Sequence, residues 1–205
     1  MHALLNISGV IDRINAFVGK WVSWLILAAV VVSATNAIIR KLFNMSSNGF
    51  LEIQWYFFSA VFLLCAGYTM LRNEHVKIDV FAHMLSKKKQ IWIDIIGIVF
   101  FLWPMSIIIM SLAWPLFVDS FTRNEVSTNA GGLIIWPARL MIPVGFALLL
   151  MQSVSELVKR LAFLSGRGPN PLEKHQGRSA EEELAEEIAR ERGVEAAPVL
   201  EGKQS

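Results

Sequence analysis

Charged residues are scarce in this chain of 205 residues, and four long stretches contain none near their centres. Only 18% of the residues are charged, whereas 54% are hydrophobic. Soluble domains carry about a quarter charged residues. The basic residues do not gather into the kind of strongly positive patch that nucleic acids require. The composition therefore indicates a membrane protein and excludes a nucleic-acid partner.

Cysteine and histidine are also rare. Cys65 is the only cysteine, so the chain cannot form an internal disulfide, and its place in an apolar run favours packing as a small hydrophobe. Haem ligation would need histidine within the apolar stretches. Nucleotide-binding loops and nucleophile motifs are missing as well. We therefore expect no cofactor and no enzymatic activity. The four histidines, all outside the apolar stretches, are His2, His75, His83 and His175.

Four apolar stretches are each long enough to cross a bilayer as a helix, which takes about 20 residues. The third contains Pro104 and Pro115, which should kink it or end it early. The sequence thus predicts an all-α integral membrane protein whose membrane domain covers residues 21–160. The predicted spans are approximately 21–41, 52–71, 92–117 and 136–157.

Three further segments flank these spans. Residues 1–20 have apolar side chains at spacings of three and four, which predicts an amphipathic helix on the membrane surface. The loop 73–90 is too polar to span, and its apolar residues share one face, so we expect an interfacial helix between spans two and three. Residues 165–205 begin with a linker rich in Gly and Pro. They continue as an acidic tail that should be flexible or partly helical.

Basic residues predict the orientation, because short cytoplasmic loops are enriched in Lys and Arg. One side of the predicted bundle carries Arg13, Lys20, Arg72, Lys77, Lys87, Lys88, Lys89, Lys159, Arg160 and Arg167. The other side carries Arg40, Lys41, Arg123 and Arg139. Both termini and the middle loop are therefore expected in the cytoplasm.

Glu52 and Arg139 are the charges nearest the membrane, so they are the first candidates for a role. Because both lie near span ends, we favour a structural pair, Glu52 with Arg139 or with Arg40, over a transport role. A metal site at His75, Asp79 and His83 is disfavoured, since the three would spread over two helical turns.

Several runs resemble the small membrane subunit (DctQ-type) of tripartite ATP-independent periplasmic (TRAP) transporters. The resemblance covers roughly residues 10–162. The matching runs are Glu52-Ile-Gln54-Trp-Tyr-Phe-Phe, Arg72-Asn-Glu-His75-Val-Lys-Ile-Asp79, Trp136-Pro-Ala-Arg139 and Ile142-Pro-Val-Gly-Phe146.

This resemblance implies sodium-coupled import of an organic acid across the bacterial inner membrane. The partners would be a large multi-span permease subunit, a periplasmic substrate-binding protein and the membrane lipids. The small subunit would support the large one, with the substrate and sodium sites in the large subunit. The structural or interface candidates are then Glu52, Gln54, Arg72, His75, Asp79, Trp136 and Arg139.

Two other functions compete with this interpretation. One is a membrane redox or quinone-binding accessory subunit, against which the positions of the histidines argue. The other is a small exporter acting as a dimer, for which a charged residue within a span would be expected. The centres of the spans contain no Asp, Glu, Lys, Arg or His.

Overall fold

The structure is a computed structural model that describes residues 2–43, 48–72 and 86–166. The predicted interfacial helix, including His75 and Asp79, lies largely outside the described residues, as does the tail from residue 167. The elements are α1 (His2–Phe43), α2 (Asn48–Arg72), α4 (Lys87–Ile96), a π-helical segment η1 (Gly97–Leu102), α5 (Trp103–Thr122) and α6 (Trp136–Leu164).

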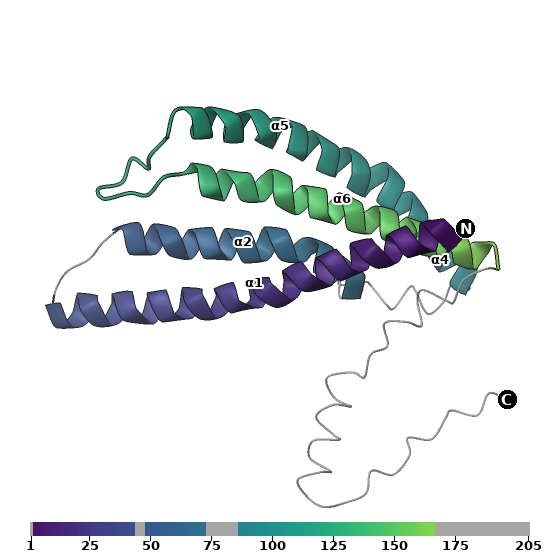
Figure 1. The fold of residues 1–205 in the computed structure, drawn as a ribbon, viewed down its shortest axis with the longest axis horizontal. Helices are drawn as coiled ribbons and strands as arrows, with labels where there is room; N and C mark the ends of the chain where they lie inside the picture. Colours follow the sequence, from purple (N-terminus) through teal and green to yellow (C-terminus); the bar gives the residue numbers. More distant parts are fainter. Residues whose placement is uncertain (1, 44–47, 73–85, 167–205) are drawn as a thin grey trace, which may run out of the picture. The chain divides into compact units, whose positions relative to one another are not determined.

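Four of the helical stretches are long and apolar enough to cross a membrane (Figure 1). This confirms the predicted all-helical class with four spans. The helices run past the predicted spans because they continue through the polar residues that flank each apolar run. α2, for example, begins at Asn48, and α6 ends at Leu164.

The helix predicted for residues 1–20 is present, but it is continuous with the first span. No proline interrupts residues 2–43, so nothing forces the helix to stop between them. The polar side chains of this first part lie against α6, and Ser8 and Asn15 are buried there. Its apolar residues, such as Leu4 and Ile7, stay exposed.

Neither proline of the third span ends the helix, which runs from Lys87 to Thr122 through α4, η1 and α5. Pro104 lacks an N–H group, and its ring would clash with the carbonyl four residues earlier in a regular α-helix. The wider π-helical segment lies directly before it, and the Trp103 N–H donates to the Ile98 carbonyl, five residues back. We infer that the wide turn accommodates Pro104, while Pro115 lies within α5.

α2 and α6 form the central pair of the bundle, with α1 packed on both and α5 packed on α6 (Figure 1). Glycines bring these helices close together. Gly19 of α1 faces the Tyr68 ring, and Gly145 of α6 faces the backbone of Leu63 in α2. Small residues at such contacts allow close van der Waals packing, which is the main attraction between helices in lipid.

Burial follows the reverse of the pattern in a soluble protein. Side chains such as Gln152, Ser153 and Asn15 are fully buried between helices, whereas Phe62 is 80% exposed. A bilayer offers apolar side chains a favourable surface but gives polar groups no hydrogen bonds. Buried polar side chains such as Ser8 and Gln152 therefore find partners within the bundle, and many large apolar side chains, such as Phe62, face outward.

The close contact of α6 with α2 generates a stability prediction. A methyl group on Gly145 would lie 2.7 Å from the Leu63 carbonyl oxygen, which belongs to the helix backbone and cannot rotate away. We expect Gly145→Ala to lower the free energy of unfolding in detergent by about 1–3 kcal/mol, as overpacking does in other cores. Gly9→Ala is the control, because no atom lies within 4 Å of its added methyl group. Equal stability of the two variants would show that the α2–α6 contact is not tight.

Candidate functional site

One face of α2 holds the loop that joins α5 to α6. Asn48, Glu52 and Tyr56 recur every four residues, so they lie above one another on the same side of the helix. Asn48 donates to the Ala130 carbonyl at 3.3 Å, and the Tyr56 hydroxyl donates to the Ile134 carbonyl at 3.0 Å. Glu52 lies between them and accepts three hydrogen bonds from the same loop.

The Glu52 carboxylate is the centre of this contact, and its side chain is buried. One oxygen accepts from the Ser127 hydroxyl and from the Asn129 amide, the latter at 2.8 Å. The other accepts from the Leu133 backbone N–H at 2.7 Å. We name this group, Glu52 with Ser127, Asn129 and Leu133, the loop cluster.

The pairing expected for Glu52 was wrong. Among the described residues, Arg139 forms a bidentate pair with Glu125, at 2.5 and 2.9 Å, and not with Glu52. Arg40 lies on α1 and does not contact the Glu52 carboxylate either. Neutral donors satisfy a carboxylate when they surround it, so Glu52 needs no cation here.

The loop is itself ordered by its backbone. Ser127 N–H donates to the Leu133 carbonyl at 2.9 Å and Ile135 N–H to the Glu125 carbonyl at 2.9 Å. Gly131 turns the chain with a φ of 72°, a conformation that favours glycine. At the end of the loop, Trp136 begins α6, and its ring lies nearly perpendicular to the Phe121 ring, with 5.4 Å between the ring centres.

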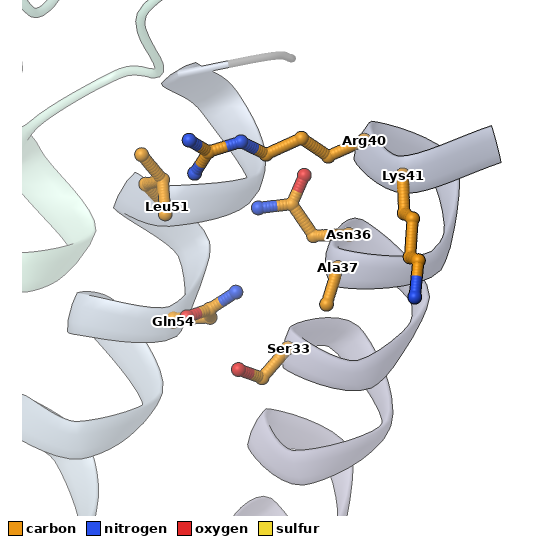
Figure 2. A pocket seen from close by; sticks show the side chains of 7 residues that line it. All are labelled: Ser33, Asn36, Ala37, Arg40, Lys41, Leu51 and Gln54. Atoms are coloured by element: carbon orange, nitrogen blue, oxygen red, sulfur yellow. The ribbon is translucent and has the colours of Figure 1, made fainter. Parts of the chain in front are cut away.

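Gln54 and Arg72, two other predicted candidates, lie elsewhere on α2. Gln54 lines an open groove between α1 and α2 together with Asn36 and Arg40 (Figure 2). At the opposite end of α2, the Arg72 Nε donates to the Tyr68 hydroxyl at 2.9 Å, and the guanidinium lies 5.4 Å from the centre of that ring. Since the Tyr68 ring also covers Gly19, Arg72 braces the contact of α2 with α1.

A second polar cluster, which the sequence analysis did not predict, joins α1, α4 and α6. Asp12 of α1 accepts from Gln152 at 2.9 Å and from Ser155 at 2.7 Å, and it pairs with Lys159 at 2.7 Å. Asn15 also donates to Gln152, at 3.0 Å. The sequence did hold a sign of this cluster. Ser8, Asp12 and Asn15 are spaced by four and three residues, which puts their polar side chains on one face of α1.

Arg160 extends this cluster from α6 to α4. It donates to the carboxylates of Glu156, at 2.5 Å, and of Asp94, at 3.1 Å. Glu156 also receives Lys159 at 2.8 Å. We name the set Asp12, Asp94, Gln152, Ser155, Glu156, Lys159 and Arg160 the ion cluster.

These arrangements fix helices and a loop. Within the described ranges, no group of three His, Cys, Asp or Glu side chains could hold a metal ion. The loop cluster and the ion cluster lie at opposite ends of the bundle. Their hydrogen-bonding groups are occupied by one another, as buried polar groups generally are.

Comparison with known proteins gives one match. A family model described as "Tripartite ATP-independent periplasmic transporters, DctQ component" matches residues 29–163. No curated protein and no solved structure matches the chain. The matched range is more than half of the chain. It includes the loop cluster and most of the ion cluster, but not Asp12.

The loop cluster yields a prediction for Glu52→Gln. The amide would present an N–H₂ group to donors that now point at a carboxylate oxygen, so at least one hydrogen bond should be lost. Hydrogen–deuterium exchange should therefore become faster at the Leu133 amide and its neighbours in the loop. Asp119→Asn is the control, since Asp119 pairs with Arg123 on the exposed surface of α5. Unchanged exchange in Glu52→Gln would mean that the backbone of the loop holds it without Glu52.

Proposed function

Because the chain belongs to the DctQ-component family of TRAP transporters, we propose that it supports a large permease subunit in the sodium-coupled import of an organic acid. In this proposal a periplasmic binding protein delivers the substrate, and the large subunit carries it across the bacterial inner membrane. The observation that carries the proposal is the family match over residues 29–163.

The centres of the spans carry no charged side chains. This favours a role in holding the large subunit over a role in carrying the substrate. No Asp, Glu, Lys, Arg or His occurs in residues 21–39, 53–71, 95–118 or 140–155. Ion-coupled transporters generally bind their ions and substrates near the midplane, through such side chains or through exposed backbone carbonyls.

Continuous helices support the same role. Discontinuous helices supply backbone carbonyls to ions in many transporters. The four described spans are instead unbroken, and the only wide turn among them is η1. Such helices keep their carbonyls within the helix, so they offer few ligands to a sodium ion.

The outer surface is suited to contact another membrane protein. Trp55, Phe58 and Phe62 lie at spacings of three and four along α2 and are 72%, 56% and 80% exposed. Aromatic side chains bury large areas when another helix packs on them. The loop and ion clusters would keep this surface in a fixed position at both ends of the bundle.

We further propose that both termini lie in the cytoplasm, on the basis of the basic residues in the short loops. A reporter enzyme that is active only in the periplasm, fused after Ser205, is expected to stay silent. The same reporter inserted at Ala130, in the α5–α6 loop, serves as the control and should be active. The reverse pattern would overturn the orientation.

Reconstitution tests the supporting role. Liposomes should contain the large subunit with this chain, with the binding protein and a radiolabelled organic acid outside and a sodium gradient directed inward. We expect uptake from this mixture and none when the large subunit is omitted, because the chain lacks midplane groups for transport. Replacing the sodium gradient by an equal potassium gradient should abolish uptake.

Two controls separate the parts of the proposal. Omitting this chain should lower uptake while leaving the substrate affinity of the binding protein unchanged. If this chain and the binding protein gave sodium-dependent uptake without the large subunit, the supporting role would be wrong. Equal uptake with potassium would remove the sodium coupling but leave the partnership standing.

A further inference from the structure

An open groove of about 410 Å³ lies between the last turns of α1 and the first turns of α2. Figure 2 shows Arg40 reaching across this groove toward Leu51. Although Asn36 belongs to the lining, its Oδ1 atom is buried and out of the reach of a ligand. The polar side chains of the lining that a ligand can reach are those of Ser33, Arg40, Lys41 and Gln54.

The lining carries two positive charges and no negative one. Arg40 and Lys41 are exposed in the last turn of α1, and neither forms an ion pair within the described ranges. The lining contains no Asp or Glu. Two like charges on neighbouring residues repel each other, so a negatively charged ligand in the groove would be stabilised by both.

The acidic side chains at this end of the bundle do not supply the missing negative charge, because each described one already has partners within the chain. These are Asp119 with Arg123, Glu125 with Arg139, and Glu52 with the donors of the loop cluster. The connection between α1 and α2, residues 44–47, has no acidic residue in its sequence. The two cations of the groove therefore call for a negative charge from outside the chain.

The position of the groove along the span points to a lipid as the source of that charge. The uncharged stretch of the first span ends at Ile39, directly before Arg40, so the groove cations lie where the headgroups begin. Exposed apolar side chains continue from the cations into the membrane, with Ile38 on α1 and Trp55 on α2. A surface that is basic at headgroup level and apolar beyond it fits a phospholipid, whereas a soluble anion would use only the basic part.

We propose that this groove binds an anionic phospholipid, one whose headgroup carries no positive charge. The phosphate lies against the Arg40 guanidinium, whose planar fork can donate two parallel hydrogen bonds to it, and Lys41 adds a second positive charge. The acyl chains follow the exposed apolar surface of α1 and α2. The proposal depends neither on the transport role nor on the orientation, because both leaflets of a bilayer contain phospholipids.

The charges of the groove decide between kinds of phospholipid, since all of them bring a phosphate. The ammonium group of an ethanolamine headgroup would add a third positive charge beside two that have no carboxylate to offset them. A glycerol headgroup adds no charge, and its hydroxyl groups can form hydrogen bonds with the side chains of Ser33 and Gln54. The groove therefore favours a headgroup with a net negative charge.

Native mass spectrometry on the delipidated full chain tests the proposal with three probes, which are phosphatidylglycerol, phosphatidylethanolamine and inorganic phosphate. We expect phosphatidylglycerol to bind about fivefold more tightly than phosphatidylethanolamine, which is the effect of one charge at this level. Equal or tighter binding of phosphatidylethanolamine would overturn the choice of an anionic headgroup. Equal binding of inorganic phosphate would overturn the choice of a lipid.

Variants assign the binding to the groove. Arg40→Gln should weaken the binding of phosphatidylglycerol about fivefold, and adding Lys41→Gln should weaken it further. Arg123→Gln is the matched control, because it removes one positive charge at the same end of the bundle, where Arg123 pairs with Asp119 and does not line the groove. An equal loss of binding in Arg123→Gln and Arg40→Gln would mean that the general charge of this end attracts the lipid, and the groove site would be wrong.

A second measurement leaves the groove cations intact. A photo-crosslinking residue at Ala37, which lines the groove, is compared in native membranes with one at Thr35, which is exposed but does not line it. Lipid captured at position 37 should be enriched in anionic phospholipid relative to position 35. The same lipid composition at both positions, or the capture of protein alone at position 37, would overturn the proposal.

Discussion

The polar groups of this chain must satisfy one another, because the interior of a bilayer supplies no hydrogen bonds. This constraint determines which faces of the helices meet. Asn15 and Gln152 bond to each other at 3.0 Å between α1 and α6, and Trp103 donates to Ser153 between α5 and α6 at 2.8 Å. Gly67 of α2 lies beside the first of these contacts, where an added side chain would meet Asn15 and the Leu148 carbonyl. Many of the large apolar side chains are left to face outward.

The strongest polar interactions lie at the two ends of the bundle. Glu52 holds a loop at one end, and Asp12, Glu156 and Arg160 join three helices at the other. Between these ends the helices pack closely, as where Gly145 of α6 lies against Leu63 of α2. These fixed ends and the apolar outer surface are what the proposed supporting role would require.

Much of the fold could be predicted because long uncharged runs have few alternatives to a spanning helix. The contacts that particular residues make could not be predicted from the sequence. Glu52 was expected to pair with a cation, since arginine is the obvious partner for a carboxylate near a membrane. Its actual partners, Ser127, Asn129 and the Leu133 amide, are neutral and lie more than 70 residues away in the sequence. The ion cluster was missed for a related reason. Lys159 and Arg160 served in the sequence analysis only to predict the orientation, although they also pair with Asp12 and Asp94.

The wide turn η1 changes which way the two halves of the third span face. Asp94 and Trp103 are nine residues apart, and both contact α6, through Arg160 and Ser153. In an uninterrupted α-helix, at about 100° per residue, side chains nine positions apart would point in opposite directions. A π-helical turn takes up one extra residue with almost no added rotation, which brings the two side chains to within about 80° of each other. The single extra residue thus rotates the second half of the helix relative to the first. It allows one continuous helix to face α6 with both its charged beginning and its apolar remainder.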